Sequence, residues 1–73
     1  MNILMPGLYR HYKGNFYQVL GIARHSETLG EHVVYKSMNG KEGENLWIRP
    51  LQMFMEQVSL NGVQVPRFSF VKP

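Results

Sequence analysis

The chain has 73 residues, with eight lysines and arginines against five glutamates, three histidines and no cysteine. At this length it forms a single domain, residues 1–73, and its formal net charge of +3 allows an anionic partner without requiring one. The lack of cysteine excludes disulfides, thiolate catalysis and cysteine-based zinc or iron–sulfur sites. No apolar run approaches the ~20 residues of a membrane helix. We therefore expect a cytoplasmic domain with no signal peptide, no membrane segment and no cofactor.

Short runs of aromatic and β-branched residues, separated by turn residues, predict a small antiparallel β domain. The first run covers 8–12, and Lys13-Gly14-Asn15 predicts a tight turn after it. In the second run, 16–24, apolar residues stand at both odd and even positions. A strand with one buried face would have them at only one of these two sets of positions. This pattern predicts a long strand that bends and contributes to two faces, with Gly21 as the bend or bulge.

The middle of the chain continues the same alternation of runs and turns. Residues 25–30 form a connection, and 31–38 form the third run. The stretch 39–45 is the most polar and contains two glycines, which predicts an exposed, mobile hairpin loop. A short fourth run follows at 46–49.

Pro50 changes the pattern, because proline favours the first position of a helical turn. Residues 50–54 therefore predict one turn of helix, of the 3₁₀ type. A longer helix over 51–58 is the competing interpretation, since Leu51, Met55 and Val58 have helical spacing.

The last part of the chain predicts a hairpin. Asn61-Gly62 is the strongest short-range hairpin signal and suits a type I′ turn. It joins a strand that ends at Leu60 to one over 63–65, and Pro66 interrupts before a final edge strand at 67–71. The whole pattern predicts an all-β fold, a small SH3-like barrel of about five antiparallel strands with one short helical turn. The residues expected in its core are Phe16, Val19, Val34, Leu46, Ile48, Phe54, Val58 and Phe68.

Several segments together carry a family resemblance. They are Tyr9-Arg10-His11-Tyr12-Lys13-Gly14-Asn15, Val19-Leu20-Gly21-Ile22-Ala23-Arg24-His25-Ser26-Glu27-Thr28, Val33-Val34-Tyr35, Leu46-Trp47-Ile48-Arg49-Pro50 with Met53-Phe54, and Pro66-Arg67-Phe68. This ordered set resembles the small bacterial family called domain of unknown function 1653, from about Gly7 to Val71. The resemblance implies an SH3-like β-barrel and implies no activity.

The run Arg24-His25-Ser26-Glu27-Thr28 places a cation, an imidazole, a hydroxyl and a carboxylate at a strand end. As a recognition site, Arg24 would hold an anionic group by paired hydrogen bonds, with His25 and Glu27 orienting it. As a structural loop, Ser26 and Thr28 would satisfy backbone groups, and Glu27 would pair with an arginine.

Two kinds of chemistry have little support in the sequence. A serine nucleophile needs a base, an acid and an oxyanion hole gathered in space, and adjacency of His25 and Ser26 does not supply them. His25, Glu27, Glu31 and His32 could in principle ligate zinc or manganese, but they match no known spacing motif. We expect neither catalytic residues nor a metal site.

Four arginines sit beside aromatic or apolar neighbours, namely Arg10, Arg24, Arg49 and Arg67. Arginine stacks on aromatic rings and binds phosphate or carboxylate in a fixed fork. The sequence therefore favours a non-enzymatic module that binds an anionic small ligand or an acidic group of a partner. Its expected ligand-binding residues are Arg24, His25, Glu27, Tyr35, Arg49 and Arg67, with Tyr35 as a wall.

Other functions stay open. Arginines with stacking aromatics also suit a nucleic-acid-binding module, although the mild net charge disfavours a broad nucleic-acid surface. An accessory domain of an enzyme is a further alternative. The small core and the edge strand also allow a homodimer.

Overall fold

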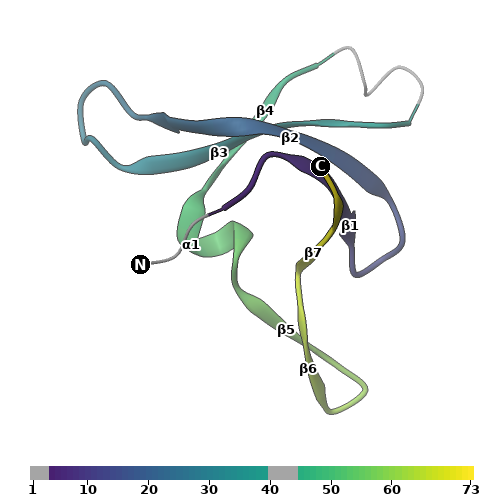
Figure 1. The fold of residues 1–73 in the computed structure, drawn as a ribbon. Helices are drawn as coiled ribbons and strands as arrows, with labels where there is room; N and C mark the ends of the chain where they lie inside the picture. Colours follow the sequence, from purple (N-terminus) through teal and green to yellow (C-terminus); the bar gives the residue numbers. More distant parts are fainter. Residues whose placement is uncertain (1–3, 40–44) are drawn as a thin grey trace.

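The computed structural model describes residues 4–39 and 45–73, which form an all-β fold with one short helix (Figure 1). Its elements are β1 (Gly7–His11), β2 (Phe16–Arg24), β3 (Glu31–Ser37), β4 (Trp47–Pro50), α1 (Leu51–Phe54), β5 (Gln57–Leu60), β6 (Val63–Pro66) and β7 (Phe68–Lys72). The all-β class and the single helical turn after β4 are confirmed. The turn is α-helical rather than 3₁₀, and β5 takes the place of the longer helix. The polar loop expected at 39–45 falls mostly outside the described residues.

Five strands form one antiparallel sheet in the order β4-β3-β2-β1-β7, and β5 pairs with β6 in a separate two-stranded sheet. β4 and β7 are therefore the edges of the larger sheet, and no pairing joins them within the described residues. A closed barrel is not observed there. In Figure 1 the β5–β6 hairpin extends away from the larger sheet, and α1 lies between β4 and the hairpin. Within residues 4–39 and 45–73, no helix is long and apolar enough to cross a membrane.

β2 carries the bulge that its sequence predicts. Val19 pairs with Tyr35, but the next pair is Gly21 with Val34, so Leu20 is the extra residue. An extra residue reverses the alternation of faces. Before the bulge Val19 points into the core. After it, Ile22 shares a face with the buried Val33. The apolar residues at both odd and even positions of β2 are thus explained by one strand that bends at a bulge.

The hairpin signal near the C-terminus is also confirmed. Asn61 and Gly62 both have positive φ angles, 51° and 81°, as a type I′ turn requires. Leu60 then pairs with Val63, and Val58 pairs with Val65. Asparagine and glycine tolerate this left-handed region better than other residues, so these two residues set the register of the hairpin.

The core is small and aromatic. Phe54 of α1 stacks on Phe68 of β7, with ring centroids 4.0 Å apart and planes 3° from parallel. Tyr9 and Tyr35 meet Phe54 edge-on, at 5.5 and 5.6 Å. Such edge-to-face contacts suit the opposite charges of ring edges and faces. The buried apolar residues among those described are Tyr9, Val19, Val33, Tyr35, Phe54 and Phe68.

The expected core is partly wrong. Val19, Phe54 and Phe68 are buried as predicted, and Val34 and Val58 are half-buried. The exposed residues that were expected inside are Phe16, Leu46 and Ile48, at 40%, 63% and 62% exposure.

Strand alternation explains this error. β3 turns Val33 and Tyr35 inward, so Val34 and its partner Ile48 face outward. Tyrosines occupy the interior instead, because their hydroxyl groups find partners there. The hydroxyl of Tyr9 donates to the carbonyl of Met5 at 2.7 Å, and burial raises the pKa of this phenol.

The Phe54–Phe68 stack predicts a large effect of one substitution. Phe54→Ala should lower the free energy of unfolding by about 3–5 kcal/mol, since it removes a fully buried ring. That is comparable to the total stability of a domain this small, on the order of 5 kcal/mol. Urea denaturation followed by circular dichroism measures it. Met53→Ala in the same turn is the control, because Met53 is 45% exposed and its loss should cost about 1 kcal/mol or less. Equal losses for the two variants would contradict the role given to the stack.

Candidate functional site

Arg49 lies on β4, at one edge of the larger sheet, with its side chain on the core side. Its Nε donates a hydrogen bond to the hydroxyl of Tyr35 at 3.3 Å. Its guanidinium carbon lies 5.8 Å from the centroid of the Phe68 ring. Because Phe68 belongs to β7, the side chain of Arg49 reaches from one sheet edge toward the other.

Arg67 precedes β7 and is held by both its backbone and its side chain. Its backbone N–H donates to the carbonyl of Glu56, and its carbonyl accepts from the N–H of Tyr12. Its Nη2 forms an ion pair with Glu56 Oε1 at 2.7 Å. The side chain is only 21% exposed, and its buried Nε has no hydrogen-bond acceptor among the described residues. One donor of this guanidinium is therefore unsatisfied.

His11, at the end of β1, contacts the same Phe68 ring as Arg49, and its pKa responds to the charges of both arginines. Its ring contacts the rings of Tyr12 and Phe68, with centroids 4.6 and 4.9 Å apart. Burial lowers the pKa of His11 below its ordinary value of 6.5, and the positive charges of Arg49, Arg67 and Lys13 lower it further. We call His11, Arg49 and Arg67, with the adjoining Tyr35 and Phe68, the basic cluster.

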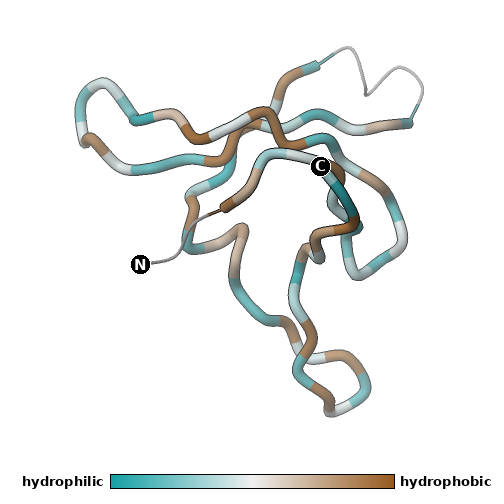
Figure 2. Tube along the Cα trace, in the orientation of Figure 1, coloured by the Kyte–Doolittle hydropathy of each residue, from teal (hydrophilic) through white to brown (hydrophobic). Residues whose placement is uncertain are grey.

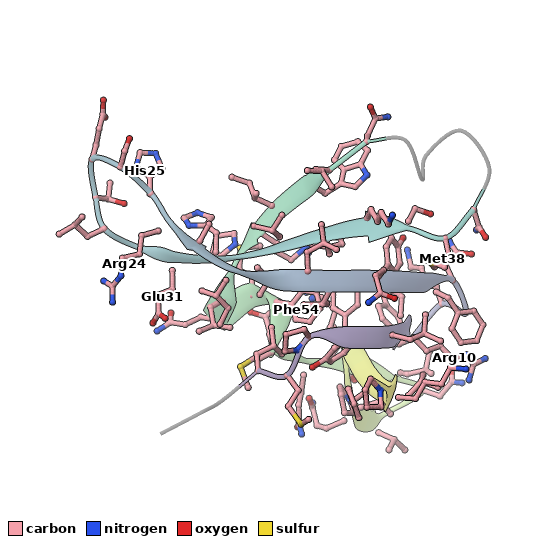
Figure 3. The ribbon with its side chains drawn as sticks, turned by 45° about the horizontal axis from the view of Figure 1, so that its top comes forward. Arg10, Arg24, His25, Glu31, Met38 and Phe54 are labelled. Carbon is pink, nitrogen blue, oxygen red and sulfur yellow. The ribbon has the colours of Figure 1, made fainter. Side chains whose placement is uncertain are left out.

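The fold brings only part of the expected site together. Arg49, Arg67 and Tyr35 belong to the basic cluster. Arg24, His25 and Glu27 are exposed at the tip of the β2–β3 hairpin, and no hydrogen bond or ion pair in the described part of the chain joins them to it. Figure 3 shows Arg24 and His25 at one end of the molecule, away from Phe54.

The tip of the β2–β3 hairpin is an internally hydrogen-bonded loop. The Nδ1 of His25 accepts from the N–H groups of Glu27 and Thr28, at 3.1 and 3.3 Å. The hydroxyl of Thr28 accepts from the N–H of Gly30, and Arg24 donates to the carbonyl of Leu29. His25 thus satisfies the backbone groups that Ser26 was expected to satisfy.

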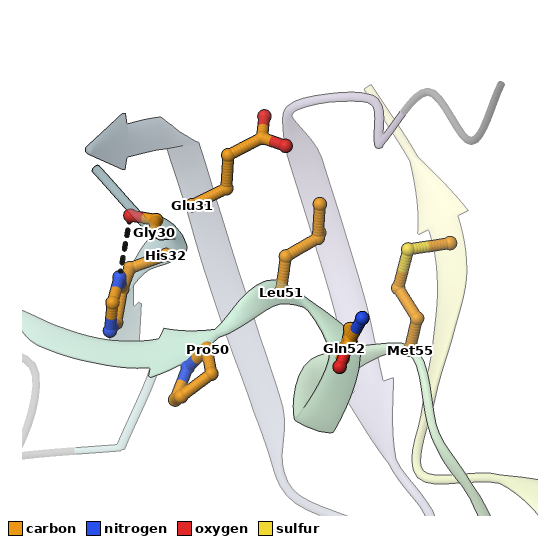
Figure 4. Close-up of a pocket in the computed structure, with 7 residues that line it drawn as sticks. All are labelled: Gly30, Glu31, His32, Pro50, Leu51, Gln52 and Met55. Atoms are coloured by element: carbon orange, nitrogen blue, oxygen red, sulfur yellow. Dashed lines mark hydrogen bonds between the residues drawn. The ribbon is translucent and has the colours of Figure 1, made fainter. Parts of the chain in front are cut away.

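A hollow of about 720 Å³ lies elsewhere, between the start of β3 and α1 (Figure 4). Its lining consists of Gly30, Glu31, His32, Pro50, Leu51, Gln52 and Met55. The Nδ1 of His32 is 3.1 Å from the carbonyl of Gly30, which fixes the orientation of this ring. Glu31 is the only formally charged residue of the lining, and a carboxylate repels anions. The hollow is therefore a poorer place for an anion than the basic cluster.

The residues weighed as metal ligands do not form a metal centre. Across residues 4–39 and 45–73, no three or more His, Cys, Asp or Glu side chains gather in a way that could hold an ion. The rings of His25 and His32 have centroids 6.0 Å apart. However, the Nδ1 atoms of both rings are already hydrogen-bonded to their own loop.

Fold and site together define a small all-β domain with a half-buried cluster of arginine, histidine and aromatic side chains. The chain belongs to the family of proteins of unknown function DUF1653, whose model matches residues 7–70, and the resemblance found in the sequence is confirmed. It is similar to a crystal structure of a protein of this family from Bordetella bronchiseptica. The two are 38% identical, with a TM-score of 0.83 over 96% of this chain and 94% of that one. No curated protein matches the chain.

The sequence analysis does not select His11 as a site residue. The alternation of strand side chains could have pointed to it, because a buried Tyr9 places His11, two residues later, on the same inward face of β1. The approach of Arg49 and Arg67 to this histidine had no local signal, because it depends on the curvature of the sheet.

The basic cluster predicts a pH dependence of stability. The folded chain has the lower His11 pKa, so the unfolded chain takes up this proton first as the pH falls. The contribution of His11 to the free energy of unfolding should therefore decrease below about pH 6.5 and level off below the folded-state pKa. Urea denaturation between pH 5 and 8 should show a steeper decline for the wild type than for His11→Gln. In NMR titrations, Arg49→Gln should raise the His11 pKa only partway toward 6.5, because burial is the larger cause. If the free energy of unfolding of His11→Gln declines as steeply toward low pH as that of the wild type, His11 is not the source of the pH dependence.

Proposed function

We propose that this domain is a non-enzymatic binding module that holds a small anionic ligand, or an acidic or phosphorylated group of a partner, at the basic cluster. One observation carries the proposal. The Phe68 ring contacts both His11 and the guanidinium of Arg49, Arg67 adjoins Phe68 in the sequence, and the charges of both arginines lower the pKa of His11. Bringing like charges together around a half-buried imidazole is unfavourable on its own, and a bound anion would relieve it.

The charges around His11 favour an anion. Three cations, Arg49, Arg67 and Lys13, act on this ring, and the only ion pair within the described residues is that of Arg67 with Glu56. The net local charge is positive even with His11 neutral. The aromatic rings beside the arginines exclude water and strengthen such interactions.

The hydrogen-bonding capacity of the arginines points the same way. Arg49 uses Nε for Tyr35, and Arg67 uses Nη2 for Glu56. Each guanidinium has further N–H groups for a ligand oxygen, and the buried Nε of Arg67 has no acceptor of its own. Phosphate and carboxylate match the planar fork of arginine.

The proposed site does not include Arg24, His25 and Glu27, which are exposed at the tip of the β2–β3 hairpin. The sequence predicts that they bind the same anion as Arg49. Because Arg24 lies apart from the basic cluster, it is a suitable control position for anion binding there.

We also propose that the curved sheet, with its helical turn between β4 and the hairpin, is an open relative of the SH3-like barrel. A cytoplasmic location remains part of the proposal.

Titration with inorganic phosphate, followed by NMR of backbone amides and arginine Nε–H groups, tests the proposal. We expect saturable shifts at the Nε–H signals of Arg49 and Arg67 and a rise in the His11 pKa when phosphate binds. Arg49→Gln should weaken binding about tenfold, the effect of losing one charge-assisted hydrogen bond. Glu56→Gln should strengthen binding, because it removes the carboxylate that competes for Arg67.

Arg24→Gln is the matched control and should leave the phosphate affinity unchanged. If Arg24→Gln weakens binding and Arg49→Gln does not, the anion site lies at the tip of the β2–β3 hairpin. If neither Nε–H signal shifts, the basic cluster is a structural feature. Retention on a single-stranded DNA column that falls steeply with salt would instead favour the nucleic-acid alternative.

A further inference from the structure

The β5–β6 hairpin has one apolar face and one polar face. Cross-strand pairs place Val58 with Val65 and Leu60 with Val63 on the same side. The other side carries Gln57, Ser59 and Gln64. Side chains of paired residues point to the same face of a sheet, so the division runs along both strands, with Pro66 opposite Gln57 as the one apolar residue on the polar side. The hydropathy colouring of Figure 2 shows the apolar residues that reach down this hairpin.

The rest of the chain leaves this apolar face partly open. Val58 and Val65, nearer the base, are half-buried, but Leu60 and Val63 at the tip are 44% and 61% exposed. Leu60, Val65 and Pro66 of the hairpin line a hollow of about 290 Å³ together with Arg10, His11, Tyr12 and Ser69 of the β1–β7 side. A hairpin of two strands has little stability of its own and needs another surface against its apolar side.

The hairpin is also free of charge. Residues 57–66 contain no lysine, arginine, aspartate or glutamate, in a chain with a net charge of +3. The charged residues on either side, Glu56 and Arg67, pair with each other at 2.7 Å. Two copies of a basic chain repel each other over most of their surfaces, so an uncharged face is where they can meet.

The chain exposes more surface than a compact monomer of its mass. A monomer of 8.5 kDa is expected to expose about 4,650 Å². This chain exposes 5399 Å². The excess is roughly 750 Å² over the whole chain, and the exposed side chains of Leu60 and Val63 at the hairpin tip are part of it.

We infer that the apolar face of the β5–β6 hairpin is the interface of a homodimer, in which it packs against the same face of a second copy. A face built from two strands that contribute equally, Val58 and Leu60 against Val63 and Val65, can pack on its own two-fold copy. The type I′ turn at Asn61-Gly62 holds the two strands in register before association, which reduces the entropic cost of binding. This interface borders the basic cluster, because Leu60 and Val65 line the same hollow as His11.

Sedimentation velocity on the full chain from about 5 to 500 μM tests the inference. The wild type should pass from one to two copies per particle as its concentration rises. The double variant Leu60→Lys/Val63→Lys should remain monomeric throughout. The double variant Ser59→Lys/Gln64→Lys adds the same charge to the opposite face of the same hairpin, and it should dimerise like the wild type. A monomeric wild type, or equal loss of dimer in both variants, overturns the inference.

A measurement on the wild type alone guards against a variant that fails to fold. A mixture of ¹³C-labelled and unlabelled chain should show intermolecular NOEs that involve the methyl groups of Leu60 and Val63. Intermolecular NOEs confined to another part of the chain would show that a different face forms the dimer, and would refute the assignment.

Discussion

The stacking of Phe54 on Phe68 is the contact on which the rest of this structure depends. It joins the single helical turn to the last strand, and two tyrosines from β1 and β3 close around it. With only six buried apolar side chains in the described residues, no second core can compensate for its loss. The curvature of the sheet follows from this contact, because α1 and β7 meet only if β4 and β7 turn toward each other.

The same ring connects stability with the candidate function. Phe68 stacks on Phe54 and also contacts the side chains of His11 and Arg49. Arg49 is thus held by the core itself, through Tyr35 and Phe68, and an anion bound at the basic cluster would stabilise the folded chain. Membership of a family of unknown function supplies no ligand. The chemistry of the basic cluster is therefore the main guide to one.

Local patterns predicted much of the fold because local physics decides it. The bounds of β2, a bulge one residue before the predicted Gly21, the helical turn after Pro50 and the Asn61-Gly62 turn all follow from dihedral preferences and strand alternation. The core was predicted less well. Alternation separates two faces without saying which one is buried, and so Ile48 was placed inside and Tyr9 was overlooked.

The candidate site shows the same division. The sequence by itself determined the all-β class, the turn positions, the family and the supply of arginines beside aromatic residues. Only the tertiary structure decided that His11 and Arg49 contact the same Phe68 ring, next to Arg67, while Arg24 stays at a hairpin tip. The physical reason is that dihedral and turn preferences act between near neighbours, whereas residues 11, 49 and 68 come together only because a curved sheet packs around one aromatic pair.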